Sequence, residues 1–272
     1  MKNNTVQDYA MLDTPELLSV LFHPRKEESY FGRTKTDFEM LIPVAEHVAV
    51  GACLYHSSNS APTILFFHGN GEIVADYVDI GPLYAQLGIN FLAADYRGYG
   101  RSTGSPTVTA MMADCHVILA YLIDWFRTAH YTGPLIVMGR SLGSASALEL
   151  AYHHSDTLAG LVIESGFAYM IPLLRLMGIP FASPGISEED GCRNIGKIKA
   201  VTLPTLIIHS QHDQIIPFSD AQALYDASGS DDTQLLMIPD ADHNTIFMQG
   251  LREYMAAIVD FTHSARIRNK TS

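Results

Sequence analysis

Cysteine is scarce in this sequence, and long hydrophobic runs are missing. The 272 residues include three cysteines, Cys53, Cys115 and Cys192, which stand far apart and form no C-x-x-C pair. This spacing excludes a disulfide framework and a zinc site made of cysteines. No apolar run approaches the roughly 20 residues of a transmembrane helix. The polar residues 1–18 lack the apolar core, about 7–15 residues long, of a signal peptide. We therefore expect a cytoplasmic protein without a transmembrane segment.

Positively charged residues are also few. The chain has 17 Lys and Arg against 29 Asp and Glu, which gives a net charge of −12 with neutral histidine. Such a surface repels a phosphate backbone, so nucleic acid is not an expected partner. The hydrophobic content of 47% supplies a sizeable core, which argues against disorder. With no internal repeat, low-complexity tract or linker, residues 1–272 are expected to form a single domain.

Short apolar runs recur along the chain, and stretches long enough for a crossover helix lie between them. The runs are apolar on both faces, as parallel strands covered by helices are. The intervening stretches repeat apolar residues at spacings of three and four. This alternation predicts an α/β fold with a mostly parallel sheet, preceded by an antiparallel pair at the sheet edge. The predicted pair covers 37–44 and 47–56, the other strands 62–67, 89–94, 134–138, 158–163, 204–209 and 234–238, and the helices 76–87, 107–128, 144–153, 218–227 and 246–261.

Residues 167–186 depart from this alternation. They are apolar all round, contain three prolines and carry a single charge at Arg175. They begin a cap-like insertion at about 167–200, and two interpretations stay open: a short lid over a site, or a helix packed on the body. All-round apolarity favours the packed helix.

The pattern G-x-S-x-G occurs twice, around Ser102 and around Ser141. A nucleophilic serine in this pattern needs a tight turn directly between a strand and a helix. Ser141 follows the predicted strand 134–138 and precedes the predicted helix 144–153, whereas Ser102 lies in a loop rich in glycine. We therefore expect Ser141 to be the nucleophile.

A serine hydroxyl needs a general base, and that base needs a carboxylate to orient it. Asp213 follows the predicted strand 204–209, and His243 follows the strand 234–238, at the strand ends where sites in α/β sheets gather. The order Ser141, Asp213, His243 fits the α/β-hydrolase arrangement. Asp240 and Asp242 are alternative acids, but they lie too close to His243 in sequence to reach its far ring nitrogen.

The remaining histidines are assigned no catalytic role. His209 and His212 have an H-x-x-H spacing, but a metal site is not expected because no third ligand is evident. His153 and His154 end a predicted helix, where a cation complements the helix dipole. His116 is expected to face solvent.

A loop rich in glycine follows the strand 62–67 and is suited to an oxyanion hole. In Phe66-Phe67-His68-Gly69-Asn70-Gly71 the glycines allow a backbone N–H to turn toward the serine. The second donor is expected to be the N–H of Leu142, the residue after the nucleophile. His68 is expected to brace the loop.

The sequence resembles the α/β-hydrolase superfamily over nearly its whole length. The motifs that carry the resemblance stand in the order FFHGNG (66–71), DYRGYGRS (95–102), GRSLG (139–143), PTLIIHSQHDQIIP (204–217) and DADHN (240–244). Within the superfamily, the chain is most similar to the small, nearly lidless serine hydrolases that include protein-depalmitoylating enzymes and their bacterial relatives. The resemblance implies an eight-stranded, mostly parallel sheet with helices on both faces and a minimal cap.

The resemblance also assigns the site residues. It implies Ser141 as nucleophile, Asp213 as acid, His243 as base, and the backbone N–H groups of Asn70 and Leu142 as oxyanion donors. Two departures stand out. The eukaryotic depalmitoylases carry a lipidated N-terminal cysteine cluster, and the first cysteine here is Cys53; the usual glycine after the strand histidine is Ser210.

These observations predict a serine hydrolase that cleaves a carboxylic ester or thioester through an acyl-enzyme intermediate. The substrate is expected to be a small molecule or an acylated molecule, and no cofactor or metal is implied. A peptidase or amidase using the same three residues, and a non-catalytic binding scaffold, are the alternatives. The acyl chain, the leaving group and the oligomeric state stay open.

Overall fold

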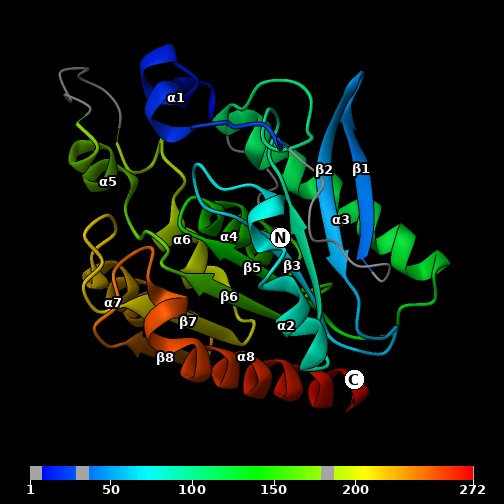
Figure 1. Cartoon of the computed structure of the whole chain (residues 1–272). Helices are drawn as coiled ribbons and strands as arrows, with labels where there is room; N and C mark the ends of the chain where they lie inside the picture. The colour runs from blue at the N-terminus through cyan, green and yellow to red at the C-terminus, as the bar shows by residue number, and fades with distance from the viewer. Residues whose placement is uncertain (1–7, 29–36, 179–186, 272) are drawn as a thin grey trace.

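A central β-sheet organises the chain (Figure 1). The structure is a computed structural model that describes residues 8–28, 37–178 and 187–271. In this part of the chain the sheet has eight strands in the order β1-β2-β4-β3-β5-β6-β7-β8. Their bounds are β1 Asp37–Ala45, β2 Val48–Tyr55, β3 Thr63–Phe67, β4 Asn90–Ala94, β5 Leu135–Arg140, β6 Gly160–Glu164, β7 Thr205–Ser210 and β8 Thr233–Ile238.

The strand directions match the prediction. Strand β2 pairs antiparallel with β1 and with β4, and every pairing from β4 to β8 is parallel. In a parallel sheet the carboxyl ends of the strands share one edge, so the loops after β3, β5, β7 and β8 meet there. The predicted antiparallel pair and the mostly parallel eight-stranded sheet are confirmed.

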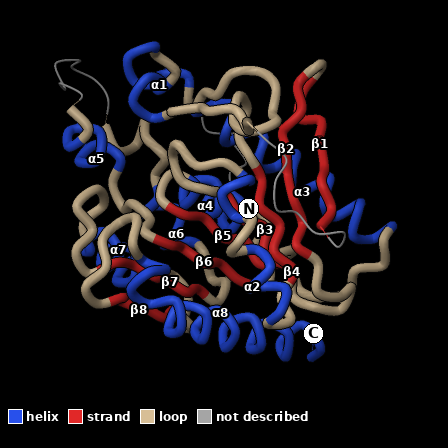
Figure 2. Tube along the Cα trace, in the orientation of Figure 1, coloured by secondary structure: helices blue, strands red, loops and turns tan. Residues whose placement is uncertain are grey.

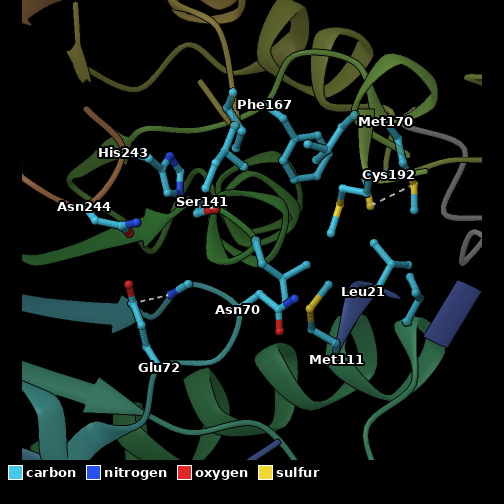
Figure 3. A pocket seen from close by; sticks show the side chains of 17 residues that line it. Leu21, Asn70, Glu72, Met111, Ser141, Phe167, Met170, Cys192, His243 and Asn244 are labelled. Carbon is cyan, nitrogen blue, oxygen red and sulfur yellow. Dashed lines mark hydrogen bonds between the residues drawn. The ribbon is translucent and has the colours of Figure 1, made fainter. Parts of the chain in front are cut away.

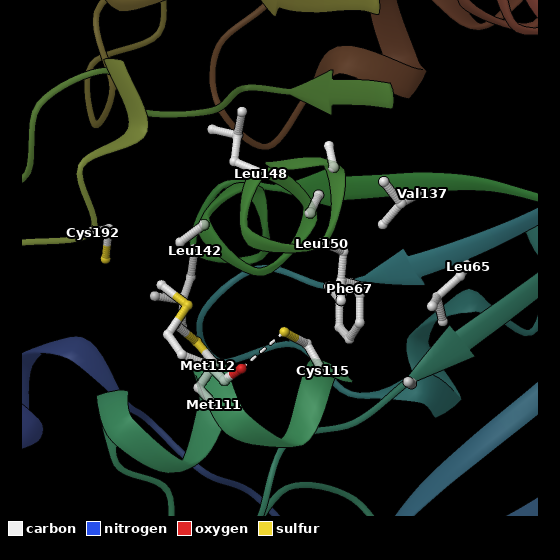
Figure 4. Close-up of a cluster of buried hydrophobic side chains, with 14 of the residues drawn as sticks. Leu65, Phe67, Met111, Met112, Cys115, Val137, Leu142, Leu148, Leu150 and Cys192 are labelled. Carbon is white, nitrogen blue, oxygen red and sulfur yellow. Dashed lines mark hydrogen bonds between the residues drawn. The ribbon is translucent and has the colours of Figure 1, made fainter. Parts of the chain in front are cut away.

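Helices cover both faces of the sheet (Figure 2). One apolar core lies between the sheet and α3, α4, α6 and α7, and Figure 4 shows side chains of this core, including Phe67, Met112 and Leu148. The other lies between the opposite face and α2 and α8. The helices are α1 Pro15–Leu21, α2 Gly81–Gln86, α3 Val108–Thr128, α4 Gly143–His153, α5 Met170–Leu176, α6 Asn194–Ala200, α7 Phe218–Ala227 and α8 Ile246–Thr271, with short 3₁₀ turns η1 Ala10–Leu12 and η2 Val74–Tyr77.

The prediction of one helix over 76–87 is wrong. The chain forms the turn η2 and then the separate helix α2, which begins at Gly81. A Cβ at Gly81 would lie 2.2 Å from the ring of Tyr55, so the backbone there rests directly on the sheet. Pro82 follows at the start of the helix, where a missing N–H costs nothing.

The sequence leads us to expect no segment long and apolar enough to cross a membrane. Helix α3 is such a segment by length and composition alone, and 44% of its most apolar stretch is buried in the protein. Its buried face packs in the core beside the sheet. Its Asp114 forms a bidentate ion pair with Arg97, with both distances 2.7 Å. In this fold α3 is therefore a core helix.

The segment that holds η1 and α1 is fastened to the body by a buried polar cluster. The Lys197 ammonium lies 2.5 Å from the Glu149 carboxylate and donates to the Tyr9 hydroxyl at 3.1 Å. The Tyr9 hydroxyl in turn donates to Glu149 at 3.1 Å. His116 and His153 each place a ring nitrogen 3.4 Å from the same carboxylate. The expectation that His116 only faces solvent is wrong, because this cluster engages it.

We expect Lys197→Met to lower the free energy of unfolding by about 3–5 kcal/mol, because it leaves the Glu149 carboxylate buried without its ammonium partner. Although burial opposes ionisation, His116 and Lys197 lower the pKa of Glu149 to about 2. The stability from this carboxylate is present above its unfolded pKa of about 4.3 and is lost as the pH falls toward 2. Urea unfolding should therefore show the largest difference from the parent near pH 6–7 and a shrinking difference below pH 4. Lys199→Met, an exposed lysine of the same helix, is the control, and an equal loss in both variants would contradict the account.

Candidate active site

Ser141 lies on the turn between β5 and α4. Its φ of 51° lies in the left-handed region, which a non-glycine residue adopts at a cost. A Cβ at position 139 would lie 2.2 Å from the carbonyl oxygen of Gly143, and one at position 143 would lie 2.1 Å from that of Phe67. Both glycines of the motif are thus required by close packing. The Ser141 N–H donates to the Glu164 carbonyl at 2.9 Å, which holds the turn against β6.

The structure brings Ser141, His243 and Asp213 together. Nε2 of His243 lies 3.1 Å from Oγ of Ser141, and Nδ1 lies 2.7 Å from Oδ2 of Asp213. All three residues are at least 90% buried. The contacts join the loops after β5, β7 and β8, which are far apart in sequence. This order of contacts suits proton transfer from the hydroxyl to an oriented imidazole.

Asp213 is held by its own loop. Its Oδ1 accepts hydrogen bonds from the N–H groups of Ile215, at 3.0 Å, and Ile216, at 2.8 Å. Burial alone would raise the pKa of Asp213, but the hydrogen bond and the charge of His243 outweigh it and hold that pKa below its usual value. The carboxylate is therefore ionised at neutral pH.

The alternative acids have a local role. Asp242 is exposed, and its Oδ1 accepts from the Asn244 N–H and the Thr245 hydroxyl, both at 2.9 Å. Asp240 is exposed as well, and among the described residues the hydrogen-bond partners of the His243 ring are Asp213 and Ser141 alone. Of the three aspartates, only Asp213 reaches the imidazole.

The second G-x-S-x-G motif has a structural role. Ser102 is buried, and its hydroxyl accepts from the N–H of Gly51 at 2.9 Å. It does not line the cavity that opens on Ser141. His209 is also structural, since Nε2 of its buried ring lies 2.8 Å from the Ile216 carbonyl. Within residues 8–28, 37–178 and 187–271, no group of three or more His, Cys, Asp or Glu side chains is arranged to hold a metal ion.

Asn70 and Leu142 flank Ser141 on the wall of the same cavity. Leu142 immediately precedes α4, so its N–H lies at the positive end of the helix dipole. The side chain of Asn70 is held by the N-terminal segment and by Tyr99. Its Oδ1 accepts from the N–H of His23 at 2.8 Å and from the hydroxyl of Tyr99 at 2.9 Å. Among the described residues, neither the Asn70 nor the Leu142 N–H has a protein acceptor, so both are available to an oxyanion.

His68 braces the oxyanion loop, as expected. Its Nδ1 lies 2.8 Å from the Gly69 carbonyl, and its Nε2 lies 3.2 Å from the Asp95 carboxylate. Its own carbonyl accepts from the Tyr96 hydroxyl at 2.7 Å. The ring is fully buried and does not line the cavity.

An apolar cavity of about 270 Å³ opens on Ser141 (Figure 3). From Ser141 and His243 it extends toward Met170, Cys192 and Leu21. Its apolar wall is formed by Leu21, Val108, Met111, Leu142, Phe167, Met170, Leu173, Met177, Cys192, Ile215 and Ile216.

In its described part, the segment predicted as either a lid or a packed helix packs on the body and also forms part of the cavity wall. Helix α5 buries Met170, Ile171 and Leu174 in the body, while Met170, Leu173 and Met177 line the cavity. Leu176 is 58% exposed. Ile179 and Phe181, which the sequence also placed in this segment, lie outside the described residues.

One buried cluster next to the site was missed by the sequence analysis. Arg140, the variable residue before Ser141 in the motif, is only 6% exposed and forms ion pairs with Glu72 and Glu164. The available signal was a charged residue at the end of an otherwise apolar strand. Its partners lie far away in sequence, so no local pattern connects them.

Fold and site together define the class of protein. The sheet topology, the nucleophile turn and the Ser-His-Asp contacts are those of an α/β-hydrolase. The chain belongs to the Hydrolase_4 family, described as serine aminopeptidase, S33, which matches residues 58–181 and 193–248. It is thus a serine hydrolase of the α/β-hydrolase superfamily, and the resemblance seen in the sequence is confirmed.

Similar proteins agree with this assignment. Protein bem46 of Schizosaccharomyces pombe is 30% identical over 214 residues, which cover 75% of this chain and 68% of bem46. The human alpha/beta hydrolase domain-containing protein 17B is 29% identical over 248 residues, or 87% and 79% of the two chains. Among solved structures, the Pyrococcus furiosus esterase Pf2001 superposes with a TM-score of 0.71 at 16% identity, over 90% of this chain and 98% of the esterase. That last likeness shows the shared fold.

Proposed function

We propose that the protein is an esterase or thioesterase that transfers a hydrophobic acyl group to Ser141 and then to water. The observation that carries the proposal is the apolar cavity that opens directly on a serine hydroxyl, which is itself hydrogen-bonded to a buried His-Asp pair. The hydroxyl attacks the carbonyl carbon while His243 takes its proton, and Asp213 holds the imidazole in the required tautomer. The N–H groups of Asn70 and Leu142 bind the oxyanion.

The tetrahedral intermediate then collapses to an acyl-enzyme, which water hydrolyses in a second step. His243 returns the proton to the departing alkoxide or thiolate, which leaves an acyl group bonded to Oγ of Ser141. A water molecule, deprotonated by the same imidazole, attacks this ester and releases the carboxylic acid. The proton taken from water regenerates the serine hydroxyl.

The cavity supports a hydrophobic acyl group as the substrate class. Its volume of about 270 Å³ is just below the range of ligand pockets, roughly 300–1,000 Å³, and so suits a small acyl group. The end of the cavity farthest from Ser141, at Met170 and Cys192, is apolar (Figure 3). An acyl chain that extends toward this end would have its carbonyl group beside Ser141. The net charge of −12 disfavours anionic substrates by slowing their encounter with the protein.

An aminopeptidase activity, which the family description suggests, fits the site less well. An aminopeptidase has to bind the ammonium group of its substrate, and a carboxylate serves this purpose. Glu72 is the single carboxylate among the described cavity-lining residues. Its oxygens are already used by the Gly69 N–H at 2.7 Å, the Tyr77 hydroxyl at 2.6 Å and the guanidinium of Arg140.

We expect kcat/KM for p-nitrophenyl esters to rise from acetyl to longer chains, about fourfold for each methylene until the cavity is full, because each buried methylene contributes about 0.8 kcal/mol. An uncharged thioester of the best chain length should be hydrolysed, and aminoacyl p-nitroanilides should not. A flat profile that starts at acetyl would contradict the assignment of the cavity, and efficient anilide hydrolysis would favour the peptidase.

The wall of the cavity should set the preferred chain length. Met177→Ala enlarges the cavity, so we expect it to shift the kcat/KM profile toward longer esters with the thermal midpoint nearly unchanged. Leu176→Ala, at the exposed neighbouring position, is the control and should leave the profile as it is. If Met177→Ala lowered the midpoint by several degrees without altering the profile, this side chain would be ordinary core.

A further inference from the structure

Arg140 occupies an unusual position for a guanidinium, buried directly before the nucleophile. Its Nη2 donates to the backbone carbonyl of His243 at 2.9 Å and lies 3.5 Å from Oδ1 of Asn244. Its Nε lies 3.1 Å from Glu72 and 3.4 Å from Glu164. One side chain therefore contacts the loop that carries the base and two carboxylates from other parts of the chain.

Glu72 connects this guanidinium to the oxyanion loop. Through Oε1 it pairs with Arg140, and through Oε2 it accepts from the N–H of Gly69, the residue before Asn70. The Tyr77 hydroxyl donates to the same Oε2. In Figure 3, Glu72 lies on the same side of the cavity as His243 and Asn244. The position of the Asn70 N–H is thus linked to Arg140 through Glu72.

Glu164 connects the guanidinium to the nucleophile turn. The carbonyl of Glu164 accepts from the Ser141 N–H, and its carboxylate accepts from the Tyr254 hydroxyl at 2.7 Å. Tyr254 belongs to α8, the helix that follows the His243 loop. The three parts of the site therefore share one buried polar cluster.

We propose that Arg140 is a positioning residue, which holds the nucleophile turn, the oxyanion loop and the His243 loop in their reactive arrangement. The inference rests on the proposed function and adds a residue that the Ser-His-Asp chemistry does not itself require. Arg140 does not line the cavity, so it acts through the groups it holds and makes no contact with the acyl chain.

Arg140 is a buried cation between two carboxylates. Burial opposes the guanidinium charge, yet Glu72 and Glu164 raise the pKa of Arg140 above its usual value. Burial likewise raises the pKa of Glu164, against the effect of Arg140. A guanidinium offers five N–H donors in a fixed planar fork, whereas an ammonium is a single point of charge. Lysine at position 140 could neutralise the carboxylates but could not also span to the His243 carbonyl.

The test is Arg140→Lys, which preserves the charge but removes the fork. We expect a folded protein whose kcat is lower by about 10²-fold, the size of effect that a small misplacement of reacting groups produces. KM for the best p-nitrophenyl ester should stay within about threefold, because Arg140 is absent from the acyl cavity. Kinetics should be measured well below the thermal midpoint, with circular dichroism to establish the folded fraction.

Arg97→Lys is the matched control, since Arg97 forms a bidentate pair with the buried Asp114 away from the cavity. It should cost stability without changing kcat. Glu72→Gln removes the carboxylate charge from the Arg140–Glu72 ion pair. Because both substitutions weaken the same interaction, the loss in kcat of the double variant should be markedly smaller than the product of the two single losses.

Three results would overturn the inference: full kcat in Arg140→Lys, a loss of kcat no larger than the loss of folded protein, or fully multiplicative losses in the double variant. The failure of the proposed function looks different, because then the unsubstituted protein would itself fail to hydrolyse any ester or thioester. That outcome would refute both.

Discussion

Replacing Ser141 by alanine should reduce kcat/KM for ester hydrolysis by about 10⁶-fold, the scale of loss when the serine of such a triad is removed. The physical reason is that the Ser141 hydroxyl lies 3.1 Å from Nε2 of His243, and no other described residue that lines the cavity has a hydroxyl group to replace it. The fold should survive, because alanine keeps the backbone bond from residue 141 to the Glu164 carbonyl. Steady-state hydrolysis of the best p-nitrophenyl ester provides the measurement.

Ser102→Ala is the matched control, since Ser102 stands in the same G-x-S-x-G pattern. The buried Gly51 N–H would lose its acceptor, so we expect a loss of stability of about 1–3 kcal/mol with kcat/KM nearly unchanged. If both variants lost activity equally, or only Ser102→Ala did, the nucleophile would not be Ser141.

Asp213→Asn should lower kcat by about 10⁴-fold while leaving the protein folded. The amide oxygen can still accept from the N–H groups of Ile215 and Ile216. The amide nitrogen, however, would face Nδ1 of His243 as a donor and hold the ring in the wrong tautomer for taking the serine proton. The measurement is kcat at saturating ester, with unfolding curves to verify that the variant is folded.

Asp242→Asn is the control for this prediction. Asp242 accepts two hydrogen bonds in the same loop as His243 but does not touch the imidazole. We expect less than a tenfold change in kcat, of the size that a slightly loosened loop produces. A larger loss in Asp242→Asn than in Asp213→Asn would transfer the role of the acid to the loop 240–242.

Much of the fold could be predicted because its signals are local. The parallel strands are short apolar runs, and the long helices α3, α4 and α8 have clear three- and four-residue spacings. Helices α1 and α6, each of seven residues, show too few turns for such a period, and the sequence did not reveal them. The break between η2 and α2 depends on the contact of Gly81 with Tyr55, which lies 26 positions earlier in the chain.

The three residues of the Ser-His-Asp arrangement could also be located from sequence, because each follows a recognisable strand. The buried charges could not. Arg140, Glu72 and Glu164 belong to three different loops or strand ends, and only folding brings them into contact. The same holds for Glu149 with Lys197, on separate helices. Ion pairs between residues far apart in the chain produce no periodic pattern in the sequence.

The central claim is that Ser141 is an activated nucleophile, and a fluorophosphonate probe tests it most directly. Such a probe bonds to a serine only when a base has taken up its proton. After reaction of the whole protein and proteolytic digestion, mass spectrometry should find one phosphonate per chain, on the peptide that contains Ser141. Labelling at Ser102, or no labelling of the folded protein, would contradict the account.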